Sequence, residues 1–141
     1  MISPQPAVDF DPEQYVRDAL RAGCPPDQVE NLIRAGIVLQ AKQLAASAAA
    51  RLCDSPNGPT AIGFGGARGG GKSHWLLAQM GADDCQRRPG LKCLLLRKSN
   101  KANKENLEDL RKRLFAHLKH TYNATTGVLT FQNGSVIIAK H

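Results

Sequence analysis

Long apolar runs, aromatic residues and closely spaced cysteines are all scarce in this chain of 141 residues. No run of roughly 18 or more apolar residues occurs, so the sequence predicts no membrane-spanning helix and we expect no membrane partner. Aromatic residues make up only 5% of the chain, which argues against a deep hydrophobic core. The four cysteines have neither the CxxC spacing of zinc sites nor the density of a disulfide framework. We therefore expect reduced thiols that pack as small hydrophobic residues.

Charge is unevenly distributed along the chain, although the net charge of +7 is moderate. Residues 1–66 carry five basic against seven acidic residues, a balance of −2. Residues 67–141 carry fourteen against five, a balance of +9. A basic C-terminal half favours a polyanionic partner such as double-stranded DNA. The alternative is a well-hydrated surface, which would account for a milder imbalance than this one.

The first 58 residues predict a loose arm followed by a small helical appendage. The expected helices are bounded by Asp11-Pro12 and Gly23, by Pro25-Pro26 and Gly36, and by Val38 and Leu52. The strongest break in the chain, at residues 54–59, follows the third helix. We therefore expect a domain boundary that separates residues 1–58 from residues 59–141.

Strand and helix patterns alternate after this boundary. They predict a strand at residues 60–64, a helix from Lys72 to about Asp83, a buried strand at residues 91–97, a helix from about Asn103 to His120, and a hairpin in which residues 128–132 and 135–139 flank Asn133-Gly134. This order is typical of an α/β fold with a parallel sheet, to which the hairpin is an addition.

A glycine-rich loop lies between the first expected strand and the first helix of this second part. Its sequence, Gly66-Ala67-Arg68-Gly69-Gly70-Gly71-Lys72-Ser73, matches the P-loop (Walker A) pattern G-x-x-x-x-G-K-[ST] at every fixed position. Glycine lets successive backbone N–H groups approach a triphosphate, and the helix N-terminus adds partial positive charge. The pattern predicts that all these residues bind ATP, with Lys72 on the β- and γ-phosphates and the Ser73 hydroxyl on Mg²⁺. The alternative is a turn that only connects strand and helix.

Arg68 is the unusual residue of this loop. Its guanidinium has the reach to contact the γ-phosphate and to stabilise charge that develops during phosphoryl transfer. Arg68 and Lys72 are therefore the candidate catalytic residues of a P-loop ATPase. From spacing alone, a solvent-facing loop arginine is an equal alternative for Arg68.

Three stretches together resemble the ATPase domain of phage terminase large subunits. They are residues 62–73, the Leu-Leu-Leu-Arg-Lys run at residues 94–98, and Phe-Gln-Asn-Gly-Ser-Val-Ile at residues 131–137. The resemblance covers residues 36–141 well and residues 1–35 only loosely. It implies an incomplete P-loop NTPase domain with a helical appendage, in a motor that hydrolyses ATP to package double-stranded viral DNA into procapsids.

The same resemblance implies partners, a location and residue roles. The motor would work as a homo-oligomeric ring in the host cytoplasm, in contact with the portal protein and the small terminase subunit. Arg68 would contact the γ-phosphate, and an upstream glutamine, Gln40 or Gln43, would contact adenine. The alternative for both glutamines is an ordinary polar position on a helix.

Basic residues cluster behind the second expected strand. They are Lys98, Lys101, Lys104, Arg111, Lys112, Arg113 and Lys119. A solvated helix face is one interpretation of this cluster. A track for DNA phosphates or a contact with a neighbouring subunit is the other.

A P-loop ATPase also needs a later strand that ends in Asp-Glu, and no apolar strand of this sequence ends that way. Asp83-Asp84 cannot substitute, because about ten helical residues place them roughly 15 Å from the phosphates. No carboxylate-rich nuclease region is present either. We expect the N-terminal part of a large subunit, with poor turnover by itself, or a reduced gene product. The alternative functions are another P-loop enzyme (a helicase-like ATPase or a small-molecule kinase) and a non-catalytic nucleotide- or DNA-binding assembly module.

Overall fold

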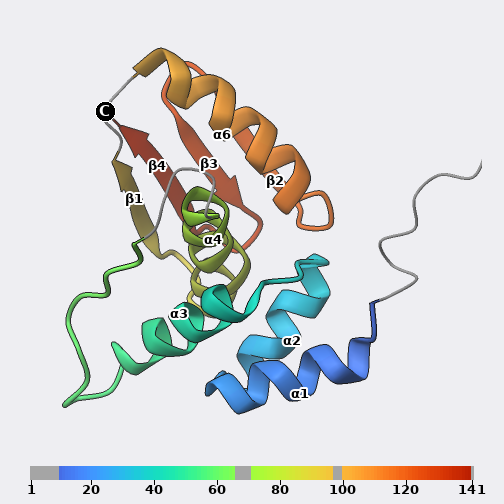
Figure 1. Ribbon diagram of the computed structural model, residues 1–141. Helices are drawn as coiled ribbons and strands as arrows, with labels where there is room; N and C mark the ends of the chain where they lie inside the picture. The colour runs from blue at the N-terminus through green and yellow to red at the C-terminus, as the bar shows by residue number, and fades with distance from the viewer. Residues whose placement is uncertain (1–9, 66–70, 97–99, 141) are drawn as a thin grey trace, which may run out of the picture.

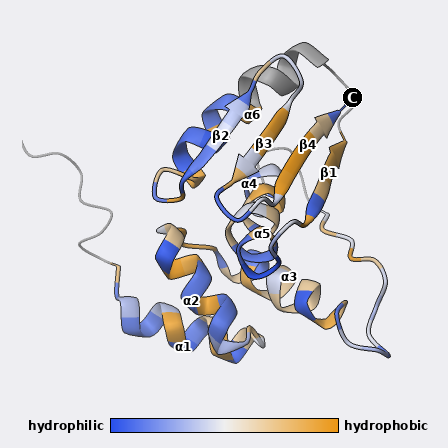
Figure 2. Ribbon diagram, turned by 180° about the vertical axis from the view of Figure 1, so that it is seen from behind, coloured by the Kyte–Doolittle hydropathy of each residue, from blue (hydrophilic) through white to orange (hydrophobic). Residues whose placement is uncertain are grey.

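The computed structural model describes residues 10–65, 71–96 and 100–140, with residues 100–106 described by their backbone only. Three N-terminal helices pack beside a central helical segment, residues 72–87, which lies against a four-stranded sheet (Figure 1). The central segment and the last helix cover one face of this sheet, and in the described part of the chain no helix covers the other face (Figure 2). The predicted α/β class is confirmed.

Helices α1 (Pro12–Ala22), α2 (Pro26–Ala35) and α3 (Ala41–Leu52) confirm the three helices expected from the sequence. The Asp11 side chain caps α1 by accepting the backbone N–H of Glu13 at 3.0 Å. Gly23 and Gly36 end α1 and α2 in the left-handed conformation that glycine adopts without steric cost. Local capping signals therefore determine where these two helices end.

Helix α3 begins at Ala41 rather than at Val38 because a tyrosine hydroxyl holds the preceding linker extended. The Tyr15 hydroxyl accepts the N–H of Leu39 at 3.0 Å and donates to the carbonyl of Ile37 at 3.2 Å. Ile37 and Leu39 are both buried in the core. The linker thus joins the helices and contributes to their packing.

The helix expected after the glycine-rich loop is confirmed and is longer than predicted. Helix α4 (Lys72–Ala78), the π-helix η2 (Gln79–Asp84) and helix α5 (Cys85–Arg87) follow one another without a break. Nothing in the sequence indicated the π-helix. Gly81 lets it approach the end of the last helix closely, since a Cβ at this position would lie 2.2 Å from the Phe115 ring. No helix in the described ranges is both long and apolar enough to cross a membrane.

Strands β1 (Lys92–Leu96), β2 (His120–Asn123), β3 (Val128–Phe131) and β4 (Val136–Lys140) form one sheet in the order β1-β4-β3-β2. Strand β1 pairs with β4 in parallel, whereas β3 pairs antiparallel with β4 and with β2. The prediction of a parallel sheet is therefore corrected to a mixed sheet with one parallel pair among the described strands.

The predicted hairpin around Asn133-Gly134 is confirmed, but its loop has three residues rather than two. The backbone N–H of Phe131 donates to the carbonyl of Ser135 at 2.8 Å, which leaves residues 132–134 between them. Gly134 has a φ of 87°, the left-handed conformation that three-residue hairpin loops require.

Two other predictions about this half of the chain are wrong. Residues 60–64 form no strand, because none of the described strands pairs with them to take their backbone hydrogen bonds. The last helix, α6 (Asn100–Leu114), ends at Leu114 instead of about His120. His120 begins β2, where it pairs with Phe131.

Strand β1 is less buried than the sequence predicted. Leu95 is 8% exposed, whereas Leu94 is 57% and Leu96 is 66% exposed. The difference arises because alternate side chains of a strand point to opposite faces. Only the face of β1 that carries Leu95 packs against the helices, while the other face is the uncovered side of the sheet.

A buried ion pair joins α3 to the end of the central helical segment. The Asp83 carboxylate is fully buried in η2, and Arg51 of α3 contacts it with two nitrogen atoms, at 2.8 and 2.7 Å. Asn31 and Gln79 donate to the same carboxylate at 3.0 and 2.9 Å. Burial opposes ionisation of Asp83, but these hydrogen bonds outweigh it and hold its pKa below the ordinary value.

We expect Arg51→Met to lower the free energy of unfolding by about 3 kcal/mol, because it removes the cation that is hydrogen-bonded to a buried carboxylate and leaves only Arg87, at 3.8 Å, nearby. Urea unfolding followed by Trp75 fluorescence measures this change, since Trp75 is the single tryptophan of the chain. The matched control is Arg34→Met, which removes an exposed ion pair with Glu30 and should cost at most about 1 kcal/mol. Equal losses in both variants would contradict the prediction.

Candidate functional site

The structure describes the last three residues of the glycine-rich loop. Gly71 is the N-cap of α4 with a φ of 79°, and Lys72 and Ser73 are the first residues of that helix. Lys72 is exposed and Ser73 is half-buried. Gly66, Ala67, Arg68, Gly69 and Gly70 lie outside the described residues. The predicted order of glycine, lysine and serine at a helix start is therefore present in the fold.

Helix α3 contacts the start of α4 through two polar side chains. Gln43 donates from Nε2 to the Gly71 carbonyl at 3.1 Å, and the same carbonyl accepts the helical N–H of Trp75 at 2.9 Å. One turn further along α3, Ser47 accepts a hydrogen bond from the Trp75 indole at 2.8 Å. The first contact is part-buried and the second is buried, and together they hold the first turn of α4 from one side.

An aromatic contact holds the same turn from another side. Phe64, the last apolar residue before the glycines, stacks on Trp75 with ring centroids 5.1 Å apart and an interplanar angle of 13°. The segment before the loop therefore approaches α4 through this ring pair rather than through strand pairing.

The charge around this helix start favours an anion. Lys72 is exposed at the first position, and Arg113 of α6 lies near His74. Burial, with a smaller contribution from the Arg113 charge, lowers the pKa of His74 below its ordinary value. The described side chains of this turn therefore include a cation and a neutral imidazole at pH 7, and the helix dipole adds positive potential.

The two glutamines that the family resemblance linked to adenine have different surroundings. Gln43 is 5% exposed, and its side-chain amide makes two hydrogen bonds with the backbone. Nε2 donates to the Gly71 carbonyl, and Oε1 accepts the N–H of Gln40 at 2.8 Å. Gln40 is the exposed N-cap of α3. Of the two, only Gln40 has a side chain that is accessible to a ligand.

The members of the basic cluster differ in their surroundings. Lys98 lies outside the described residues, and the side chains of Lys101 and Lys104 are not described. Arg111 is half-buried, pairs with Glu108 and lies 4.9 Å from the centre of the Tyr122 ring. The exposed members near the end of α6 are Lys112, Arg113 and Lys119.

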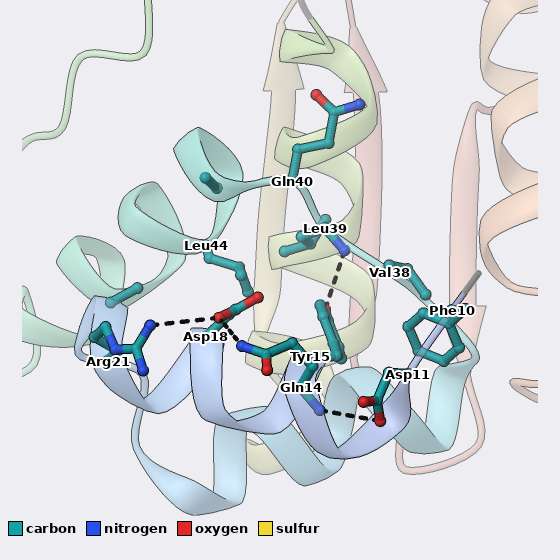
Figure 3. Close-up of a pocket in the computed structure, with 12 residues that line it drawn as sticks. Phe10, Asp11, Gln14, Tyr15, Asp18, Arg21, Val38, Leu39, Gln40 and Leu44 are labelled. Atoms are coloured by element: carbon teal, nitrogen blue, oxygen red, sulfur yellow. Dashed lines mark hydrogen bonds and ion pairs between the residues drawn. The ribbon is translucent and has the colours of Figure 1, made fainter.

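A groove of about 690 Å³ lies between α1 and the start of α3 (Figure 3). Tyr15, Leu39 and Leu44 contribute apolar surface to it, and Asp18 lies at its rim, where it pairs with Arg21 at 3.8 Å. The described loop residues, Gly71, Lys72 and Ser73, do not line this groove, whereas Gln40 does.

Comparisons with protein-family models, with curated proteins and with solved structures found no match to this chain.

Sequence reasoning missed Ser47 and Trp75 as neighbours of the candidate site, and it considered Gln43 for a different role. One signal was present, because Gln43 and Ser47 are four residues apart and thus share a face of an alanine-rich helix. Which element this face contacts depends on tertiary packing, which no local pattern records.

Gly71→Ala should destabilise the protein by about 1 kcal/mol more than Gly90→Ala. Both glycines have a left-handed φ, 79° and 75°, so both variants carry the same backbone strain. A Cβ at Gly71 would lie 2.6 Å from Gln43 Nε2 and break its hydrogen bond, whereas nothing lies within 4 Å of one at Gly90. Denaturant unfolding of both variants measures the difference, and equal destabilisation would show that the Gln43 contact contributes nothing.

Proposed function

We propose that this chain binds Mg-ATP through residues 66–73, in a P-loop NTPase domain that serves as the ATPase part of a viral DNA-packaging motor of the terminase large-subunit type. The observation that carries the proposal is the placement of Gly71, Lys72 and Ser73 at the start of a helix that packs against the sheet. A complete Walker A pattern in this position is typical of a triphosphate site.

The residues at this helix start fit a magnesium-bound triphosphate. Gly71 brings no side chain to the N-cap, so a phosphate meets no steric barrier there. Lys72 is exposed, with the reach to contact the β- and γ-phosphates, and Ser73 offers a hydroxyl oxygen, a donor of the kind that Mg²⁺ prefers. Bound Mg²⁺ would supply charge neutralisation at the phosphate oxygens. Arg68 would stabilise charge on the γ-phosphate.

Lys72→Ala should weaken Mg-ATP binding roughly 10- to 100-fold, the effect of losing one charged hydrogen bond. Arg68→Ala should leave the affinity within a few-fold, because we propose that Arg68 acts mainly on charge that develops in the transition state. Titration calorimetry on the 141-residue chain measures both.

The control for this experiment is Lys42→Ala, which removes an exposed lysine of α3. It should bind Mg-ATP as the parent does. Absence of Mg-ATP binding by the folded parent chain would overturn the proposed function.

We also propose that exposed basic residues at the end of α6 and in the connection from α6 to β2 contact the phosphates of duplex DNA. The support is the surplus of positive charge over residues 67–141 together with the exposure of Lys112, Arg113 and Lys119. Arg111 is not included, because its side chain already contacts Glu108 and Tyr122.

Replacing Lys112, Arg113 and Lys119 by glutamine should weaken duplex binding and reduce the slope of log K against log salt by about 0.9 for each lost phosphate contact. Fluorescence anisotropy at several salt concentrations measures the slope. A matched control replaces Arg17, Arg21 and Arg34, three exposed arginines of the acidic half, by glutamine. Identical slopes for the two triple variants would place the DNA contact elsewhere.

A further inference from the structure

Three side chains of α3 make successive contacts along the central helical segment. Gln43, Ser47 and Arg51 are spaced by four residues, so they lie on one face of α3. Their partners follow in the same order and are the Gly71 carbonyl at 3.1 Å, the Trp75 indole at 2.8 Å and the Asp83 carboxylate at 2.7 Å. The order of the contacts thus follows the order of both chain segments, and Gln43 joins the N-terminal ends of α3 and α4.

The Gln43 contact differs from the other two because its acceptor is backbone at the edge of the glycine-rich loop. Gly71 has no side chain that could anchor it. Its φ is positive, a backbone conformation that other residue types rarely adopt. The Gly71 carbonyl is held by two donors, Gln43 Nε2 and the Trp75 N–H. Gln43 is held in turn, since its Oε1 accepts the N–H of Gln40 at 2.8 Å.

The orientation of the Gly71 carbonyl determines the orientation of the next amide. A peptide unit is planar, and in the trans form its C=O and N–H point in opposite directions. Since the chain has no cis peptide bond among its described residues, a donor that fixes the Gly71 carbonyl also fixes the direction of the Lys72 N–H. That amide starts the helix at the point where a phosphate would bind.

We propose that Gln43 is a positioning residue for the phosphate-binding loop, acting through the Gly71–Lys72 peptide. This inference rests on the proposed function. It differs from the adenine contact that the family resemblance suggested, because the Gln43 amide is 5% exposed and bonded at both ends. A positioning role predicts an effect on the triphosphate that is independent of the base.

The test uses Gln43→Met, which removes the donor without adding charge, and Gln43→Glu, which keeps the size and the acceptor of the side chain but carries a negative charge at pH 8. At pH 8 Gln43→Met should bind Mg-ATP, Mg-GTP and Mg-tripolyphosphate each about five- to tenfold more weakly than the parent chain, as expected for one lost hydrogen bond. Gln43→Glu should bind them more weakly still, because its carboxylate also repels the phosphates. As the pH falls toward about 5, protonation of the buried glutamate restores a donor, and the affinity ratio between variant and parent should approach one.

The matched control is Ser47→Ala, which removes the contact with the Trp75 indole and leaves Gly71 untouched. It should lower thermal stability while its affinity for the three ligands stays within about twofold of the parent. If Gln43 had a merely structural role, the Gln43 variants and Ser47→Ala would lose stability but keep similar ligand affinities, and low pH would not change the affinity of Gln43→Glu relative to the parent.

A second measurement needs no ligand. The amide resonance of Lys72 in the nucleotide-free protein should shift in the uncharged variant Gln43→Met and should stay unchanged in Ser47→Ala. An unchanged Lys72 resonance in Gln43→Met, or parental affinity of this variant for all three ligands, would overturn the positioning role. A loss confined to Mg-ATP would assign Gln43 to adenine instead. If the parent binds none of the ligands while the Lys72 resonance still shifts, the proposed function fails and the Gln43 contact stands.

Discussion

Asp83 brings a negative charge into the interior of the protein, and the groups that neutralise it determine how the surrounding helices are placed. A carboxylate without exposure needs a cation and hydrogen-bond donors nearby, because its transfer out of water is costly. Arg51 comes from α3, Gln28 and Asn31 from α2, and Gln79 from η2 itself. One side chain thus joins the N-terminal helices to the central helical segment.

The Arg51–Asp83 ion pair also affects the other end of α3, because a helix is a rigid element. Arg51 lies near the end of α3, and Gln43 lies near its beginning. Fixing one end of α3 to η2 helps to fix the other end against Gly71 and the start of α4. The helical appendage thereby supports the glycine-rich loop as well as covering the helix that follows it.

The sheet contributes in a different way. One of its faces packs on α4 and α6, and the buried side chains Leu95, Leu129 and Ile137 belong to the same hydrophobic cluster as residues of α1 to α3. Its other face carries the exposed Leu94 and Leu96. The sheet thus supports, from one side, the helix whose start carries Gly71, Lys72 and Ser73.

Features with a local cause could be predicted from the residues alone. Asp11, Gly23 and Gly36 mark the ends of helices because capping and left-handed φ values are properties of a few adjacent residues. Asn133-Gly134 marks the hairpin for the same reason. The Walker A pattern likewise predicted a helix start at Lys72, because the requirements of that turn are written in consecutive residues.

Features whose cause lies far along the chain could not be predicted in this way, because they depend on how distant segments pack. Residues 60–64 have the composition of a strand, but a strand exists only when a neighbour takes its hydrogen bonds. The end of α6 and the start of β2 depend on pairing between His120 and Phe131. The roles of Gln43 and Asp83 depend on partners 28 and 32 residues away, because packing brings together side chains that no local pattern connects.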